Sequence, residues 1–231
     1  MTKKKFLTVS VYALAVALLF SLGLWQIQRG HSKAQIMTRL ETDQPAYQPL
    51  REMPNDFKQL IYLPAQLAGQ WQAERSFLLA NRIHRGQAGF EVLSPFQLNS
   101  GETLLVNRGW IPKDQAANFA TPQDNTPPTG LLYAPQKGFT IGSALTPEDA
   151  GWPRETLYLD IAALETALKT PLSNLVLVLA ADNANSFTRI WQPVVVSPMR
   201  HYAYAAQWFG LMIALLYLGF RWRAHFLDED K

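Results

Sequence analysis

Two apolar stretches, one toward each end of the chain, constrain the fold more than any other feature. The first runs from about Phe6 to Leu24 and the second from about Tyr202 to Phe220. About 20 consecutive apolar residues are enough for a helix to cross the hydrocarbon core of a bilayer. We therefore expect a membrane protein with two transmembrane helices that flank one water-facing domain. The predicted segments are residues 6–28 (first transmembrane helix), 29–200 (extracytoplasmic domain), 201–221 (second transmembrane helix) and 222–231 (cytoplasmic tail).

The first stretch is either an uncleaved anchor or a secretory signal peptide, and its length favours the anchor. It exceeds the roughly 7–15 residues of a usual signal-peptide core, and no small-x-small cleavage site follows it, because the chain continues directly into Leu24, Trp25 and Gln26. Basic residues lie outside both stretches, at Lys3–Lys5 and at Arg221 and Arg223. By the positive-inside rule, both termini are cytoplasmic and the domain lies outside a bacterial inner membrane, in the periplasm.

Composition excludes several classes of function. Cysteine is absent, so disulfides, iron–sulfur clusters and thiolate metal sites are excluded. The formal net charge is only +3, and no basic block with interleaved aromatic residues indicates a nucleic-acid partner. Phosphate-binding loops, dinucleotide fingerprints and nucleophile elbows are missing from the sequence. We expect that the protein is not an enzyme, and a membrane-tethered hydrolase is the weakest alternative.

The central region alternates short apolar runs with turn residues, a pattern typical of β structure. Gly89–Leu98 and Thr103–Ile111 are joined by a short Gly-containing turn and predict a hairpin. A short helix is predicted after Asp160, which suits a helix N-cap. Pro64 predicts an edge or bulged strand. The expected fold class is membrane α+β, with a mainly antiparallel β domain and one or two helices.

His201 is the strongest single candidate for a binding residue. In a helix that begins near Arg200, one face would carry His201, Tyr204, Ala205, Trp208 and Met212. A histidine at the mouth of an apolar span, above an aromatic wall, suits a haem-iron ligand. The alternative is an interfacial histidine that forms a hydrogen bond with the domain.

The end of the first stretch carries polar residues at helical spacing. Trp25, Gln28, Arg29 and Ser32 fall on one helix face. Trp25 suits an interfacial anchor, whereas Arg29 on the outer side of the membrane opposes the positive-inside rule and needs another reason.

Two motifs lie in the central domain. In Asn107–Pro112, at the end of a hairpin strand, Gly109 allows a bulge and Arg108 is expected to pair with an acidic partner. Gly69–Trp71 lies between two predicted strands and is typical of a turn with a buried tryptophan. Both motifs are either architectural or part of a binding surface.

The order of these motifs carries a resemblance to a known family. The matching residues are Leu22, Gly23, Trp25, Gln26, Arg29 and Lys33; Gly69, Trp71, Glu74 and Arg75; Val106, Asn107, Arg108, Gly109, Trp110, Ile111 and Pro112; and His201, Tyr204, Ala205, Gln207, Trp208 and Phe209. Together they resemble the surfeit locus (Shy-type) family of cytochrome c oxidase assembly proteins. The family often has an aromatic residue where this chain has Ser32.

The resemblance implies a protein that helps to build haem–copper oxidases. It implies haem a as a transiently bound cofactor, oxidase subunit I as the recipient, and haem a synthase and the lipid bilayer as further partners. The family's second-span histidine falls on His201, with Tyr204 and Trp208 beside it. Arg29 and Arg200 are candidates for the haem propionates, as is Arg108. The alternative is a cofactor-free scaffold that stabilises an oxidase assembly intermediate.

Overall fold

The chain divides into two compact units. The structure, a computed structural model, describes residues 3–42, 46–53, 60–123, 125–135, 145, 151–193 and 196–228. One unit, called here the helical unit, comprises Met1–Asp43 and Val194–Lys231, and the other, the β unit, comprises Gln44–Pro193. The last residues of the predicted cytoplasmic tail, 229–231, lie outside the described residues.

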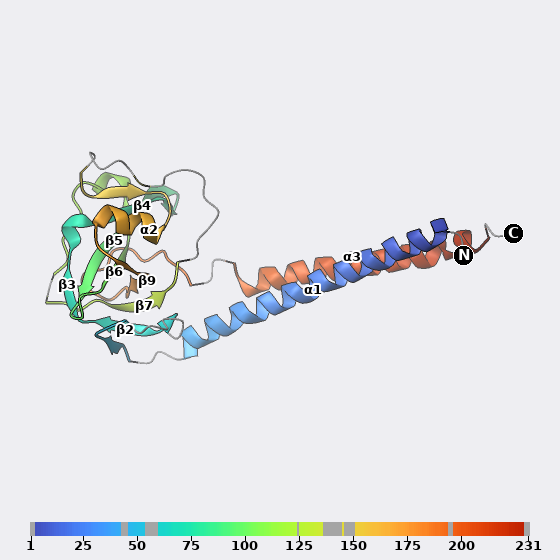
Figure 1. The fold of residues 1–231 in the computed structure, drawn as a ribbon, viewed down its shortest axis with the longest axis horizontal. Helices are drawn as coiled ribbons and strands as arrows, with labels where there is room; N and C mark the ends of the chain where they lie inside the picture. Colours follow the sequence, from blue (N-terminus) through green and yellow to red (C-terminus); the bar gives the residue numbers. More distant parts are fainter. Residues whose placement is uncertain are drawn as a thin grey trace. The chain divides into compact units, whose positions relative to one another are not determined.

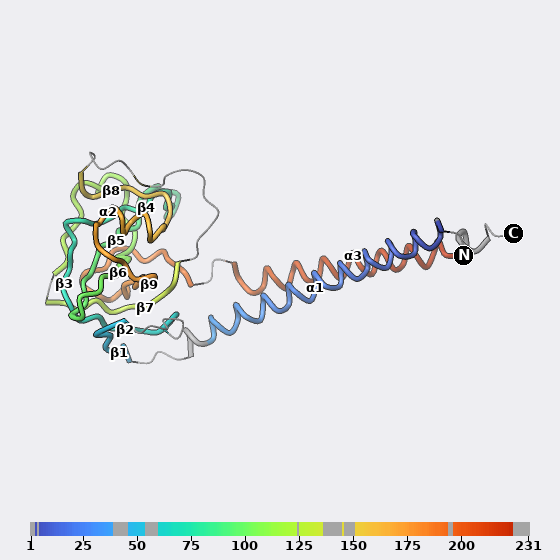
Figure 2. The backbone as a smooth tube through the Cα atoms, in the orientation of Figure 1, coloured from blue at the N-terminus to red at the C-terminus, as the bar shows by residue number. Residues whose placement is uncertain are grey.

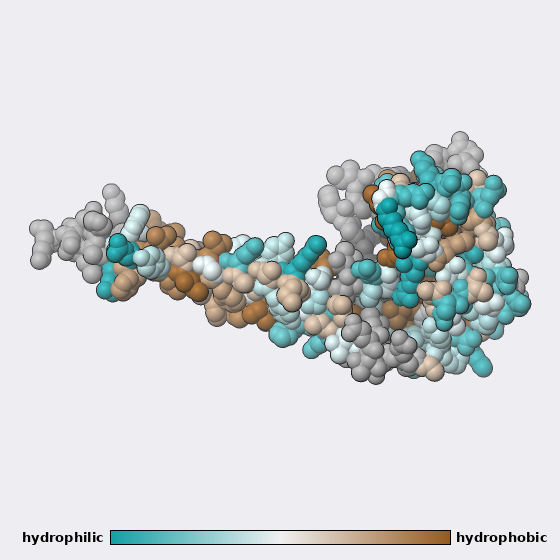
Figure 3. Space-filling model, turned by 180° about the vertical axis from the view of Figure 1, so that it is seen from behind, coloured by the Kyte–Doolittle hydropathy of each residue, from teal (hydrophilic) through white to brown (hydrophobic). Residues whose placement is uncertain are grey.

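Among the described residues, two helices form the helical unit. α1 spans Lys3–Thr42 and α3 spans Pro198–Asp228. Within them, Lys5–Thr38 and Pro198–Arg223 are long and apolar enough to cross a membrane, which is compatible with a membrane protein. Apolar side chains gather along these helices on the face shown in Figure 3. α1 continues past the predicted end of the span because no proline interrupts residues 29–42.

α1 and α3 run side by side in opposite directions (Figure 2), and aromatic rings of α3 occupy the space beside glycines of α1. A Cβ atom at Gly23 would lie 2.6 Å from Cζ of Phe209, and one at Gly30 would lie 2.5 Å from Cε1 of Tyr202. The two glycines and the two rings are each seven residues apart, or about two helical turns. Small residues of this kind let helices approach closely within a membrane.

The β unit is built on one mixed sheet. Within the described residues eight of its nine strands follow the order β1-β2-β7-β9-β6-β5-β4-β8, and the ninth, β3, pairs with β5. Figure 1 labels most of these strands. The strands are β1 (Gln48–Leu50), β2 (Pro64–Leu67), β3 (Gly69–Trp71), β4 (Phe77–His84), β5 (Gln87–Leu98), β6 (Thr103–Pro112), β7 (Thr129–Tyr133), β8 (Arg154–Thr156) and β9 (Leu172–Leu179). β1 and β2, β6 and β9, and β4 and β8 pair in parallel. The predicted antiparallel character therefore holds for only part of the sheet.

The predicted hairpin and the predicted short helix are both present. β5 and β6 pair antiparallel from Gly89↔Pro112 to Gln97↔Thr103. The helix is α2 (Ile161–Leu168), with Asp160 at its N-cap position but without a side-chain capping hydrogen bond. Short 3-10 helices, η2 and η3, cover Ala73–Arg75 and Lys113–Gln115.

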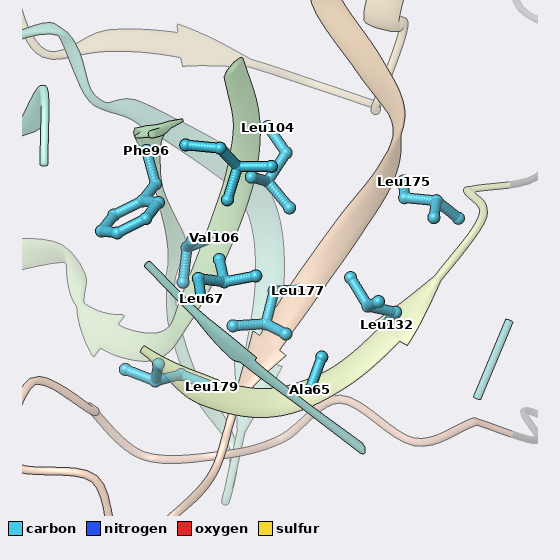
Figure 4. Close-up of a cluster of buried hydrophobic side chains, with 10 residues drawn as sticks. Ala65, Leu67, Phe96, Leu104, Val106, Leu132, Leu175, Leu177 and Leu179 are labelled. Carbon is cyan, nitrogen blue, oxygen red and sulfur yellow. The ribbon is translucent and has the colours of Figure 1, made fainter. Parts of the chain in front are cut away.

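Apolar side chains cover both faces of the sheet. On one face, Val106 and Leu177 belong to the buried cluster drawn in Figure 4. On the other, Leu105 packs in a cluster with Leu164 and Leu168 of α2. Because adjacent residues of β6 are buried on opposite faces, this strand has the continuous apolar sequence of a covered inner strand.

The strand at Pro64 was expected to be an edge strand or a bulged one, and this prediction is wrong. The stretch Asp43–Pro54 is typical of an irregular connection by its prolines, but β1 lies within its described part, 46–53. β1 pairs with Ala65–Leu67, so β2 lies between β1 and β7 without a break in register and is neither an edge strand nor bulged. Pro64 precedes the residues that pair with β1, so its missing N–H group is compatible with an inner strand.

Candidate functional site

His201 lies in the first turn of α3 and contacts Gln26 of α1. Its Nδ1 atom is 2.8 Å from Oε1 of Gln26. An amide oxygen only accepts hydrogen bonds, so Nδ1 donates, and a neutral ring then keeps the lone pair on Nε2. A hydrogen bond of this kind fixes both the tautomer and the orientation of a metal-binding histidine. The contact therefore leaves one ring nitrogen suited to bind a ligand.

The packing of the next residue sets the register of this contact. Gln26 and Gly30 are one turn apart on α1, and Tyr202, next to His201, packs against Gly30. The Tyr202 ring also lies 5.8 Å from the ring of His31 in an edge arrangement. The packing of Tyr202 against Gly30 therefore places His201 next to Gln26.

The remaining predicted site residues of the helical unit have different environments. Of the predicted α3 face, Ala205 is buried, His201, Trp208 and Met212 are half-buried, and Tyr204 is exposed. The cations and the other motif residues at these helix ends are exposed: Arg29, Arg200, Trp25 and Gln207. The guanidinium of Arg29 lies over the Trp25 ring, 5.3 Å from its centroid. The structure thus joins His201 to Gln26, while both arginines remain exposed.

The central motif of the β unit contains a β-bulge. Gly109 pairs with Val92 and Asn107 pairs with the next residue, Leu93, so Arg108 has no partner across the β5–β6 ladder. Gly109 has a φ angle of +108°, in the region that glycine adopts without strain. The predicted bulge is confirmed, and bulges commonly redirect a side chain.

On one face of the sheet, Asn107 and Trp110 of this motif form a polar network with Glu91 and Arg82. Asn107 Nδ2 donates to Oε1 of Glu91 over 2.8 Å, and Glu91 Oε2 lies 2.9 Å from Nε of Arg82. Trp110 Nε1 donates to the Arg82 carbonyl over 3.1 Å. The network fixes the end of the hairpin, and Pro112 follows as the last residue of β6.

The expected acidic partner of Arg108 is absent from the described residues. Arg108 is 2% exposed, and its Nε donates to the Asn185 carbonyl over 3.0 Å. The rings of Phe187 and Trp71 lie 4.5 and 5.9 Å from the guanidinium carbon. Burial lowers the pKa of Arg108 to about 10, so it remains charged at neutral pH. Arg82, rather than Arg108, pairs with an acid.

The Gly69–Trp71 motif is strand β3, which was predicted as a turn. Any side chain at Gly69 would overlap the carbonyl oxygen of Gln97 on the paired strand. Trp71 is half-buried, and its ring meets Phe96 edge-on at 5.2 Å. Glycine here is therefore needed for close strand pairing and brings Trp71 beside Arg108.

Several of these contacts have no counterpart in the sequence pattern. Asn185 and Phe187, which cover Arg108, lie in an irregular segment without a recognisable motif. The spacing of Gly23 and Gly30 is the signal that could have located the helix contact. No three histidine, aspartate or glutamate side chains group as a metal site within the described ranges.

Comparison with known proteins identifies the family. A SURF1 family model matches residues 13–213, most of the chain. This chain belongs to the SURF1 family. The resemblance to the surfeit locus family is confirmed, and the SURF1 match includes both Gln26 and His201 as well as the whole β unit.

Individual SURF1 relatives are similar over different lengths. Surfeit locus protein 1 of Rattus norvegicus is 26% identical over 224 residues, covering 87% of this chain and 71% of the rat protein. A SURF1-like protein of Monosiga brevicollis is 32% identical over 111 residues, or 42% of each chain. Cytochrome oxidase assembly protein SHY1 of Saccharomyces cerevisiae is 28% identical over 102 residues, covering 42% of this chain and 26% of the yeast protein. The matches to the last two proteins thus span less than half of their length.

Proposed function

We propose that this SURF1 protein assists the assembly of a haem–copper cytochrome c oxidase by holding haem a and passing it to subunit I. The name of the yeast relative supports a role in oxidase assembly. The hydrogen bond between Gln26 and His201 is the observation that supports binding of the haem. In this proposal haem a is cargo, and His201 is its iron ligand.

The residues around His201 fit such a cargo. Gln26 holds Nδ1, so the Nε2 lone pair is the one offered to iron. Trp208 and Tyr204, on the same helix, offer aromatic surface to a flat apolar ring. The exposed guanidinium groups of Arg29 and Arg200 suit propionate carboxylates, which arginine binds in a bidentate manner. A single histidine also suits a carrier, since release requires one coordination bond to break.

The two apolar helices and their basic flanks support a location in a bacterial inner membrane. The flanks at Lys3–Lys5 and Arg221–Arg223 favour cytoplasmic termini, with the β unit in the periplasm. Haem a synthase is then the partner that supplies the cargo, and the lipid bilayer surrounds the helical unit.

A cofactor-free scaffold is the second candidate. The same hydrogen bond favours it, because His201 already has a partner that ties α1 to α3. In that case His201 acts in helix packing alone, and the protein stabilises an oxidase assembly intermediate without carrying haem.

The visible spectrum of the full chain, purified in detergent after co-expression with haem a synthase, tests the two candidates. We expect haem a absorption in the wild-type protein and its loss in His201→Ala. His31→Ala is the matched control, because His31 lies in the same unit and contacts Tyr202. The haem content of the His31→Ala protein should stay at the wild-type level. A haem-free wild type, or equal haem content in His201→Ala, would contradict the carrier and favour the scaffold.

A further inference from the structure

Arg108 is a buried cation that no acid among the described residues neutralises. The side chain is 2% exposed and projects from the β-bulge. Its Nε donates to a neutral acceptor, the Asn185 carbonyl. Its Nη1 is buried without a hydrogen-bond partner in the described part of the chain. Buried charges are normally both paired and hydrogen-bonded, so Arg108 departs from the rule because it lacks an acid among the described residues and leaves Nη1 without an acceptor.

The neighbouring polar network shows that the sheet supplies an acid to another arginine, Arg82. Asn107, the preceding residue, binds Glu91, which also pairs with Arg82. That arginine is more exposed than Arg108, with a side chain that is 38% accessible. The sheet therefore provides an acid to the less buried cation and none to the more buried one.

Trp71 supplies a second unused donor beside Arg108. Its indole Nε1 is buried and has no hydrogen-bond partner among the described residues. The Trp71 ring lies 5.9 Å from the Arg108 guanidinium carbon. Two adjacent donors without acceptors match a ligand with two acceptor oxygens. A water molecule can accept from both donors but leaves the charge of Arg108 uncompensated.

The opposite side of the guanidinium is held in place. Phe187 lies 4.5 Å from the guanidinium carbon, and its backbone N–H donates to the Arg108 carbonyl. Asn185 is tied down in turn, because its side chain accepts from the Gln123 N–H and donates to the Gln123 carbonyl. Trp71 and Phe187 are both half-buried. Because Phe187 is tied to the Arg108 carbonyl, we infer that a ligand reaches Arg108 from the Trp71 side.

We propose that Arg108 and Trp71 form a receptor for an organic carboxylate supplied from outside this chain. The carboxylate accepts from Nη1 of Arg108 and from Nε1 of Trp71, and its charge neutralises the buried guanidinium. Two sources have this chemistry: an acidic side chain of a protein partner and the propionate of a small molecule. The site lies wholly within the β unit and does not depend on His201.

A thermal-shift titration of the full chain in detergent tests the receptor. Sodium propionate is the probe, propionamide is its uncharged counterpart, and sodium chloride keeps the ionic strength constant. A ligand that binds only the folded state raises the melting temperature with its concentration. We expect a saturable rise with propionate and none with propionamide.

Variants assign the effect to the two donors. Arg108→Met should abolish the response to propionate. Trp71→Phe keeps an aromatic ring but removes the N–H donor, and should raise the half-saturating concentration about tenfold, as expected for one lost hydrogen bond. Arg85→Gln is the charge-matched control on an exposed turn and should respond like the wild type. An equal response in wild type and Arg108→Met, or no propionate-specific response in the wild type, overturns the receptor.

Two further ligand pairs separate the sources. N-acetylglutamate α-amide against its glutamine counterpart represents a protein partner. Metal-free mesoporphyrin against its dimethyl ester represents a propionate-bearing small molecule, and without iron it bypasses coordination by His201. A rise in melting temperature that requires Arg108 in either pair supports the receptor and identifies the source of the carboxylate. Absence of an Arg108-dependent response in both pairs contradicts it, whatever the outcome for haem in the His201 experiment.

Discussion

Tyr202 of α3 occupies the space that a side chain at Gly30 of α1 would need. A Cβ atom at Gly30 would lie 2.5 Å from the Tyr202 ring, closer than two carbon atoms can approach without a shift. This contact lies one turn along α1 from Gln26 and one residue along α3 from His201. Helix packing and the candidate site are therefore parts of one arrangement.

Gly30→Ala should loosen the helical unit. The added methyl group must displace Tyr202, and overpacking of this kind costs about 1–3 kcal/mol. Thermal unfolding of the full chain in detergent measures the loss. Gly210→Ala is the matched control, because a Cβ atom there meets nothing within 4 Å. A similar loss in both variants would mean that the Gly30 contact is not special.

Gln26→Leu should weaken cargo binding at His201 without removing the histidine. The substitution deletes the acceptor of the Nδ1 hydrogen bond. Loss of such a partner commonly lowers metal affinity by about 10–100-fold. Haem titration followed by absorption measures the change. Gln28→Leu, on an exposed position of the same helix, should bind like the wild type, and equal weakening in both would argue against an orienting role of Gln26.

Trp110→Ala should destabilise the β unit. The residue is 7% exposed and donates to the Arg82 carbonyl over 3.1 Å. Truncation of a buried aromatic side chain costs about 3–5 kcal/mol. Urea unfolding followed by circular dichroism gives the free energy of unfolding. Ile83→Ala, with a side chain that is 71% exposed, should change it by less than about 0.5 kcal/mol. An unchanged Trp110→Ala protein would point instead to a docking role for the ring.

Replacing each of two arginines by methionine should have opposite effects on stability. Arg108→Met removes a buried charge that has no acidic partner among the described residues, so the free energy of unfolding should rise by about 1–4 kcal/mol. Arg82→Met leaves Glu91 buried with Asn107 as its remaining side-chain partner. This variant should lower the free energy of unfolding by about 1–3 kcal/mol. Urea unfolding in the absence of carboxylate ligands measures both values.

The stability difference between wild type and Arg108→Met should depend on pH in a defined window. Burial lowers the pKa of Arg108 from 12.5 to about 10. Between these values the folded protein releases the proton while the unfolded chain retains it, so the wild type gains stability relative to the variant as the pH rises. Below pH 10 the difference should be constant. If the stability advantage of Arg108→Met over the wild type grew with pH instead, the buried charge would not be its cause.

Reporter fusions should place the chain termini and the β unit on opposite sides of the membrane. Fusions at either terminus are expected to report the cytoplasm because both ends have basic flanks. An insertion in the turn Asn99–Gly101, whose Ser100 and Gly101 are exposed, should report the periplasm. A cytoplasmic signal from that turn would overturn the proposed topology.

The parts of the fold that were predictable depend on local sequence. The helices follow from uninterrupted apolar stretches, and the central hairpin follows from two apolar strands around one turn. The parallel pairing of β6 with β9 joins segments far apart in the chain, for which periodicity carries no signal. β1 was missed because its three residues, with Pro49 at the centre, are too few to show a period.

The candidate site was predictable residue by residue but not as a set of contacts. The histidine and the glutamine each lie in a recognisable motif at a span end, yet no single-sequence pattern shows that they touch. The motif Asn107–Pro112 identified Arg108 as a candidate residue from the sequence. Its missing acid became visible only when strand pairing placed Glu91 on the opposite face beside Arg82.

The contact between Gln26 and His201 also has a consequence for the timing of biosynthesis. The two residues are 175 positions apart in the sequence. At about 5–20 residues per second, a ribosome needs roughly 10–35 s to reach the second after the first. The first helix and the β unit are therefore synthesised before the histidine exists, and a nascent chain cannot capture cargo through this pair until its second helix has emerged. In the proposed carrier, the order of translation alone thus prevents premature loading of an unfinished chain through this pair.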